Sequence, residues 1–356
     1  MRSPVSILAA VLLVLSVSRF TAPAQGSLTP PGPPAPTMKT LDQIDAKLEK
    51  RTFISSLPFT INAPGAYYVA TNLTGTAGQN GITVNSSGVT LNLMGFELVG
   101  VAGSRSGIYS SASITNVTVC NGTVRDWGTN GVDIFTAYHG RLEELCFLRN
   151  GSSGVRTLAY FVVANCAARA NGGDGFAVNN GSIVANCTAT QNGGDGLSVG
   201  ADSVVSGCTA TYNGGHGISA GGGTSVSACA ASYNTGDGIY TLFGSEMTGC
   251  TLSLNAGNGI RVGGNCLVAN NNCYANGNSG AGAGILATSD GNRIEANNVT
   301  VNDWGIRVDT GGNFIVQNSA RLNSTNYFIT GTQTIGPIVT ATGTITTNSP
   351  WANFSF

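Results

Sequence analysis

A 21-residue unit that occurs five times in succession constrains this chain more than any other feature. It runs from a cysteine through an Asn-Gly-rich corner, as in Cys166-Ala-Ala-Arg-Ala-Asn-Gly-Gly-Asp-Gly-Phe, and begins again at Cys187, Cys208, Cys229 and Cys250. A fixed period of this size is typical of a solenoid, in which each repeat is one supersecondary unit that stacks on the next. We therefore expect one elongated domain in the 356 residues.

The repeat extends in both directions when it is followed by its corner glycine, which precedes an apolar residue. The corners are Gly81, Gly107, Gly131, Gly154, Gly175, Gly196, Gly217, Gly238, Gly259, Gly284 and Gly305. The spacing widens before Gly154 and between Gly259 and Gly284. A further coil without glycine is predicted around Tyr327 and Phe328, so we expect about 11–12 coils.

Within a coil the residues alternate as they do in strands. Leu197 and Val199 should point into a core, and Ser198 should point outward. Three to five glycines per unit exclude a helical repeat, and leucine is absent from the fixed positions of a leucine-rich repeat. The glycines and asparagines are expected at corners that need a positive φ. The pattern predicts an all-β chain of short, parallel, stacked strands.

In the five regular repeats the cysteine lies nine residues before the corner glycine, and the cysteines form a column. Asn271, Asn297 and Asn318 continue this column in the later coils, so the position requires a small group that can stack. Coils about 4.8 Å apart would strain a disulfide between neighbours, so we expect buried free thiols. The cysteines outside this series are the better candidates for pairing: Cys120, Cys146, Cys266 and Cys273.

Charge is sparse. Charged residues make up 9% of the chain, the net charge is −1, and the lysines (Lys39, Lys47 and Lys50) all precede the repeats. This composition excludes a basic nucleic-acid-binding surface.

The N-terminal residues indicate export. Residues 1–24 resemble a secretory signal peptide, with Arg2 before an apolar run that is too short for a comfortable transmembrane helix. We expect a secreted protein, extracellular, periplasmic or on the cell surface, with no transmembrane segment after cleavage. Residues 25–37 form a Pro-rich linker, 38–52 a capping helix, 53–348 the β-helix and 349–356 a C-terminal cap.

The stacked Asn-x-x-x-Gly-Ile corners resemble the right-handed parallel β-helix repeats of the pectin-lyase-like superfamily. Residues 54–68 and the terminal Pro-Trp-Ala-Asn-Phe-Ser-Phe are similar to a set of secreted bacterial β-helix proteins. The resemblance covers residues 39–356 and implies the fold. It does not decide function, because such folds carry lyases, hydrolases, epimerases, adhesins and passive scaffolds. Members that act on uronate polymers imply acidic residues, often with Ca²⁺, and an Arg, Lys or His as base.

One candidate catalytic group lies in the early coils. Asp133 and Arg156 are stacked neighbours in the outward column, and we expect the insertion after Asp133 to bring His139 and Glu143 near them. A histidine, a carboxylate and an arginine could act as a base and a clamp on an acidic sugar. The alternative is a surface ion pair beside a polar loop.

A candidate metal site precedes the corner glycines, where carboxylates of successive coils would stack. Asp174, Asp195 and Asp237 could share a Ca²⁺ ion, although His216 interrupts the column. Alternatively, these side chains bond to the local backbone.

Exposed aromatic and arginine side chains are candidate ligand-binding residues. They are Tyr212, Tyr233, Tyr240, Arg261 and Arg307. Aromatic rings can pack on sugars, but stacked tyrosines are equally ordinary packing across strands. A short Ser/Thr face leaves ice binding as a further alternative.

The usual catalytic strings of these families are not apparent in the sequence. We therefore expect a non-catalytic protein that binds a polysaccharide or cell-surface glycan or forms part of an extracellular surface, without a cofactor apart from possible Ca²⁺. The alternative is a lyase or epimerase acting on uronate polymers.

Overall fold

The structure is a computed structural model that describes residues 51–277, 280–340 and 343–356. The predicted signal peptide, linker and residues 38–50 of the predicted helix lie outside the described residues. The last two residues of that helix range, Arg51 and Thr52, lie in strand β1 (Arg51–Ile54), which pairs in parallel with β3 (Gly65–Val69). Every regular element within the described ranges is a β-strand.

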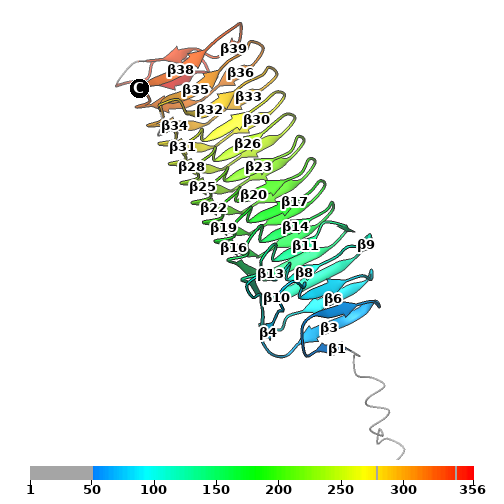
Figure 1. Cartoon of the computed structure of the whole chain (residues 1–356). Coiled ribbons are helices and arrows are strands. Elements are labelled where there is room, and N and C mark those ends of the chain that lie inside the picture. Colours follow the sequence, from blue (N-terminus) through cyan, green and yellow to red (C-terminus); the bar gives the residue numbers. More distant parts are fainter. Residues whose placement is uncertain (1–50, 278–279, 341–342) are drawn as a thin grey trace, which may run out of the picture. The chain divides into compact units, whose positions relative to one another are not determined.

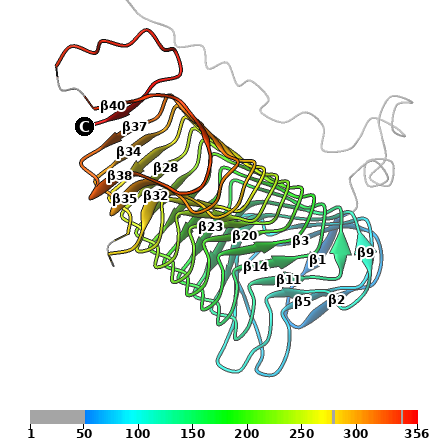
Figure 2. The ribbon, with the colours of Figure 1, turned by 90° about the horizontal axis from the view of Figure 1, so that it is seen from above.

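The strands stack into a parallel solenoid, seen from the side in Figure 1 and along its turns in Figure 2. One sheet has 13 strands, one for each turn. The fold class is therefore as predicted, with one turn more than the expected 11–12. The strands of this 13-stranded sheet are β2 (Phe59–Ile61), β5 (Ile82–Val84), β8 (Ile108–Tyr109), β11 (Val132–Ile134), β14 (Val155–Thr157), β17 (Phe176–Val178), β20 (Leu197–Val199), β23 (Ile218–Ala220), β26 (Ile239–Thr241), β29 (Ile260–Val262), β32 (Ala283–Ala287), β35 (Trp304–Val308) and β38 (Thr325–Ile329).

The turn missed from the sequence is the first. Its strand, β2, pairs with β5, and Pro58 stands where later turns have the corner glycine. The glycine-free turn predicted around Tyr327 is confirmed as β38.

A second sheet of 26 strands covers the rest of each turn. It consists of two stacked columns joined by β10 (Val117–Arg125) and β13 (Arg141–Leu148), each of which pairs with strands of both columns. The first column contains β1, β3, β6 (Val89–Asn92), β15 (Val162–Ala164), β18 (Ile183–Ala185), β21 (Val204–Ser206), β24 (Ser225–Ser227), β27 (Glu246–Thr248), β30 (Leu267–Ala269), β33 (Arg293–Glu295), β36 (Phe314–Val316) and β39 (Thr334–Ile335). The second contains β4 (Leu73–Thr74), β7 (Glu97–Val99), β16 (Ala167–Arg169), β19 (Thr188–Thr190), β22 (Thr209–Thr211), β25 (Ala230–Ser232), β28 (Thr251–Ser253), β31 (Asn272–Tyr274), β34 (Asn298–Thr300), β37 (Ser319–Arg321), β40 (Ile338–Val339) and β41 (Asn353–Ser355). A separate pair joins β9 (Ile114–Thr115) to β12 (Ala137–Tyr138).

One narrow apolar core runs through the stack. In β20, Leu197 and Val199 are buried and Ser198 is partly exposed, as the alternation predicts. Aromatic rings are part of this core, and Phe147 and Phe176 meet edge to face with centroids 6.2 Å apart. Among the described residues, no helix is long and apolar enough to cross a membrane.

The predicted cysteine column lies in this core and acts as a hydrogen-bonded ladder. The backbone N–H of Cys187 donates to Sγ of Cys208, and that of Cys250 donates to Oδ1 of Asn271. All nine cysteines are free thiols, including the four that were the better candidates for pairing. Thiol and carboxamide are interchangeable here because both accept the backbone N–H of the preceding turn.

A longer asparagine ladder marks the corner itself. Asn171 Nδ2 donates to Asn192 Oδ1 at 2.9 Å, and the same bond repeats at the equivalent asparagines from Asn150 to Asn323. Each of these hydrogen bonds between side-chain amides links one turn to the next, and the side chains are almost all buried. Such a ladder satisfies polar groups that would otherwise be costly to bury.

The corner glycines have a different physical cause from the one expected. None of Gly154, Gly175 and Gly196 has a positive φ, but a Cβ at any of them would lie 2.6 Å from the carbonyl oxygen of the next corner. Close stacking of the backbone therefore excludes a side chain. Positive φ values occur instead just before the asparagine ladder, at residues such as Ala170 (54°) and Gln191 (59°).

Candidate functional site

On the solvent side of the 13-stranded sheet, each turn presents one outward-pointing side chain. These side chains form a continuous column, which we call the outer face. It follows the paired strand centres in register, and its members point away from the core. The structure confirms the outward column read from the sequence and adds Thr60 and Phe328 at its ends. The members are Thr60, Thr83, Tyr109, Asp133, Arg156, Ala177, Ser198, Ser219, Tyr240, Arg261, Leu286, Arg307 and Phe328.

Three arginines of the outer face pack on aromatic rings. Cζ of Arg156 lies 4.1 Å from the ring centroid of Phe135. Cζ of Arg261 lies 5.3 Å from that of Tyr240, and Cζ of Arg307 lies 3.9 Å from that of Trp304. A ring beneath a guanidinium holds it extended. Nε of Arg307 already donates to Asp309 Oδ1 at 2.7 Å, so Arg156 and Arg261 are the arginines that can present an N–H edge to an anion.

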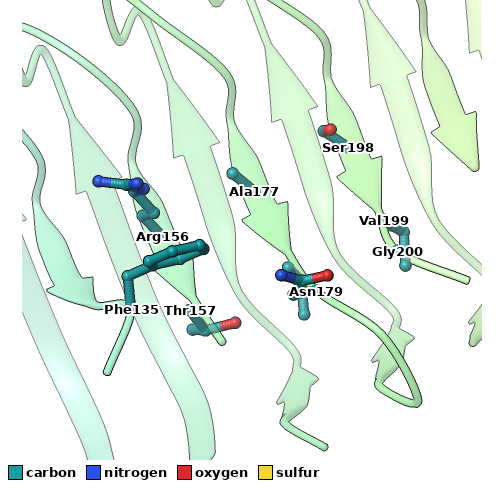
Figure 3. Close-up of a pocket in the computed structure, with 9 residues that line it drawn as sticks. Phe135, Arg156, Thr157, Ala177, Asn179, Ser198, Val199 and Gly200 are labelled. Carbon is teal, nitrogen blue, oxygen red and sulfur yellow. The ribbon is translucent and has the colours of Figure 1, made fainter. Parts of the chain in front are cut away.

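Small side chains separate the first two arginines. Ala177, Ser198 and Ser219 form a floor between Arg156 and Tyr240. A shallow depression of about 230 Å³ begins at this floor. In Figure 3, Arg156 and Phe135 lie on one side of this depression. Asn179 and Gly200, from the two following turns, line it farther along the stack. The arrangement is an open trough, suited to a ligand that lies across several turns.

A second depression, of about 430 Å³, surrounds Asp133 in the earlier turns. Asn130 Nδ2 donates to Asp133 Oδ2 at 3.0 Å, and Tyr109 and Arg105 lie in the same lining. Arg156 Nη1 is 3.9 Å from Asp133 Oδ1, so the predicted contact between these two residues is present but loose. The pair stands between the two depressions, since Asp133 lines one and Arg156 the other.

The structure does not bring His139 and Glu143 to this pair. His139 lies between β12 and β13, stacks on Tyr160 at 4.9 Å, and lines a third depression of about 260 Å³. Glu143 lies in β13, in the 26-stranded sheet, and forms an ion pair with Arg141. The insertion that we expected to return toward Asp133 instead carries the chain to another face, because it forms strand β12 beside β9.

Tyr212 and Tyr233 also lie away from the outer face. Each follows a strand of the second column in the 26-stranded sheet, and their rings stack at 4.7 Å. They are half exposed and engage each other. Of the predicted ligand-binding residues, the outer face thus brings together Tyr240, Arg261 and Arg307.

The candidate metal column is occupied by backbone hydrogen bonds. Oδ1 of Asp174 accepts the N–H of Asp195 at 2.8 Å, and Oδ1 of Asp237 accepts the N–H of Asn258 at 2.7 Å. Asp195 Oδ1 likewise accepts the N–H of His216 at 2.6 Å. Each side chain therefore bonds to the next turn rather than locally. Burial raises the pKa of Asp174. Within residues 51–277, 280–340 and 343–356, no three His, Cys, Asp or Glu side chains form a group that could hold a metal.

Several residues beside the outer face could not be recognised, or were missed, from the sequence: Phe135, Trp304 and Arg105. Phe135 lies two residues after Asp133, so continuing the outward alternation would have found it beside Arg156. Trp304 carries no such signal, because it precedes a corner glycine, a position that aspartate holds elsewhere. Arg105 reaches the depression from an insertion whose path the sequence does not determine.

The comparisons with known proteins agree with this architecture. Two segments of the chain, residues 61–204 and 186–324, match the family model "Right handed beta helix region". No curated protein sequence matches the chain.

Among solved structures, the A-module of the Azotobacter vinelandii mannuronan C-5 epimerase AlgE4 is similar, with a TM-score of 0.58 and 17% identity over 83% of this chain and 93% of that one. The A-module of AlgE6 from the same organism gives a TM-score of 0.55 and 14% identity over 88% and 91%. At these identities the likeness concerns the fold. The chain belongs to the right-handed β-helix family.

Proposed function

We propose that this protein binds an acidic polysaccharide lengthwise along its outer face, without altering it. The observation that carries the proposal is the trough itself, in which Arg156 on Phe135 and Arg261 on Tyr240 bound a floor of small side chains. The mannuronan C-5 epimerases, similar in fold, are named for a polysaccharide, which supports this class of ligand.

The spacing favours a polymer over a small molecule. Arg156 and Arg261 are five turns apart in the column, or ~24 Å at about 4.8 Å per turn. A ligand that reaches both must extend over several sugar units. Arginine favours carboxylate or sulfate groups because its planar N–H edge matches their geometry.

Export is part of the proposal. Residues 1–24 read as a signal peptide, and a polysaccharide ligand would be met outside the cell or in the periplasm. We infer a secreted or surface-attached binding protein.

A second candidate function is uronate epimerisation or elimination at the depression around Asp133. The carboxylate of Asp133 and the guanidinium of Arg105 line one concave site with Tyr109. Asp133 would take the proton next to the sugar carboxylate, and Arg105 would pair with that carboxylate. In elimination the bond to the departing sugar oxygen would then break and the Tyr109 hydroxyl would protonate that oxygen; in epimerisation the hydroxyl would instead return a proton to the opposite face of the carbon. His139 and Glu143, which lie on other elements, have no part in this version.

Binding is tested with an array of acidic and neutral polysaccharides, including polygalacturonate, mannuronan, a sulfated galactan and dextran. We expect acidic polymers to be retained, and the double variant Arg156→Gln/Arg261→Gln to lose at least tenfold in affinity, since each charged hydrogen bond contributes about 1.5–3 kcal/mol. Arg169→Gln is the matched control, because Arg169 lies in β16 of the other sheet. Retention of no polysaccharide, or equal affinity of the double variant, would contradict the proposal.

The enzymatic candidate needs a separate assay. The purified protein is incubated with polygalacturonate and mannuronan, with and without Ca²⁺, and unsaturated products and sugar epimers are followed by UV absorbance and proton NMR. Turnover that disappears in Asp133→Asn would replace the binding proposal with catalysis. Turnover that survives in Asp133→Asn would place the chemistry elsewhere.

A further inference from the structure

His216 is a ring among the aspartate and asparagine rungs of residues 174–258; in a later turn the same position holds Trp304, which stacks on Phe328. The column runs Asp174, Asp195, His216, Asp237 and Asn258, one residue before successive corner glycines. In each rung the side chain accepts the backbone N–H of the next turn. At His216 the acceptor is the ring nitrogen Nδ1, which lies 2.9 Å from the backbone nitrogen of Asp237.

This hydrogen bond determines which ring nitrogen carries the proton. A backbone N–H can only donate, so Nδ1 must present its lone pair. The proton of the neutral ring is therefore on Nε2. The Asp237 carboxylate does not compete for Nδ1, because its Oδ2 is 3.6 Å away, beyond hydrogen-bond distance.

The ring lies against the proposed binding surface. It stacks on Tyr240 with centroids 5.1 Å apart and planes 19° apart. Tyr240 is the strand neighbour of Ser219 in the floor and of Arg261 on the other side. The His216 side chain is 30% exposed. In the part of the chain that the structure describes, no hydrogen bond from Nε2 is found, so this N–H remains available to a ligand.

We infer that His216 contacts the ligand, donating a hydrogen bond from Nε2 to an oxygen of the polysaccharide bound along the trough. The inference rests on the proposed function and adds a specificity-determining residue to it. An acceptor oxygen, such as a hydroxyl, ring or carboxylate oxygen, fits this donor. The hydrogen bond from the Asp237 backbone to Nδ1 fixes the orientation of the ring, so the Nε2 donor is oriented before the ligand binds.

A purely structural role would not require a ring. Asn258 accepts the backbone N–H of the next turn with its carboxamide, and the aspartates accept it with their carboxylates. The imidazole occurs at the rung whose neighbour is Tyr240, where a planar donor can pack on the aromatic ring.

The test compares His216→Asn with the wild-type protein, using polygalacturonate and mannuronan oligosaccharides in titration calorimetry. Asparagine keeps the rung, so we expect an unchanged Tm and a three- to tenfold loss of affinity, about that of one hydrogen bond. Asp195→Asn is the control, because Asp195 lies in the same column but away from Tyr240. This variant should keep the Tm and the affinity of the wild-type protein. Nitrogen-15 NMR of the histidine ring in the free protein should show the proton on Nε2.

The outcomes separate the two proposals. Wild-type affinity in His216→Asn, or a proton on Nδ1 in the free protein, overturns the role of His216 and leaves polysaccharide binding intact. Failure of the wild-type protein to bind either oligosaccharide removes both proposals. Equal losses in His216→Asn and Asp195→Asn would show a general effect of the ladder and would also overturn the inference.

Discussion

Single residues in this protein are set by a neighbouring turn. The thiol of Cys208 and the amide of Asn192 each accept a backbone N–H of the preceding turn, and the carboxylate of Asp174 accepts one of the following turn. Chemically different residues therefore substitute for one another within a column. A carboxylate is the least suited of them, because it must keep its charge while partly buried.

Asp174 gives a prediction at this scale. Burial raises its pKa in the folded protein, so its ionised form is less favourable folded than unfolded. That cost is absent below the unfolded pKa, appears as the pH rises, and is complete above the folded pKa. Asp174→Asn should raise Tm at pH 7 by about 1–3 °C, since partly exposed charges contribute about 0–1 kcal/mol.

The gain in Asp174→Asn should shrink toward zero as the pH is lowered below about 3, under the unfolded pKa of about 3.9. Asp174→Ala, which removes the acceptor for Asp195, should lower Tm at both pH values. Thermal unfolding followed by circular dichroism checks both variants. A gain in Asp174→Asn that is equal at acid and neutral pH would contradict the assignment to charge.

The close approach of the backbones of successive turns determines where a turn requires glycine. The corner glycines show this, because their φ values are ordinary and the space for a Cβ is filled by a carbonyl oxygen. The sequence located every one of these corners but attributed them to turn conformation. Spacing alone cannot separate the two causes, since both demand glycine at the same period.

Gly196→Ala tests the stacking explanation. The new Cβ would meet the Gly217 oxygen at 2.6 Å, so we expect a loss of about 1–3 kcal/mol or more in unfolding free energy. Gly249→Ala is the matched control, because nothing lies within 4 Å of its Cβ position. Its φ of +63° is close to that of Ala228 one turn earlier (51°), so alanine there adds only the strain of a left-handed backbone, about 1 kcal/mol. Chemical denaturation of both variants measures the difference, and equal losses would contradict the explanation.

At the largest scale, the described residues form a stack of 13 turns whose ends need protection, since an open solenoid exposes core and strand edges. At the C-terminal end, β41 adds to β37, and Asn353 completes the cysteine–asparagine column by accepting from Asn318. Tyr327 donates its hydroxyl hydrogen to the carbonyl oxygen of Phe354, and burial raises the pKa of this phenol.

Removing residues 349–356 should therefore destabilise the last turns and promote association through the freed edge of β37. We expect a lower Tm, by about 2–8 °C, and larger species in light scattering, because the lost ladder and core contacts come to a few kcal/mol. Asn353→Ala should show part of the loss without the association. An unchanged Tm in the truncated protein would show that this segment is not a cap.

The sequence by itself determined the architecture, because a solenoid repeats one local rule. Alternation, corner glycines and the cysteine column each recur at a fixed spacing, so parallel stacking, the outer column and the free thiols of Cys166 to Cys250 could be predicted. The first turn was not predicted, because Pro58 stands there in place of the corner glycine. The tertiary structure decided which side chains meet at insertions and corners, where spacing carries no information. It separated His139 from Asp133, paired Phe135 with Arg156, and placed the His216 ring against Tyr240. Those contacts depend on the path of each turn in space, which no period specifies.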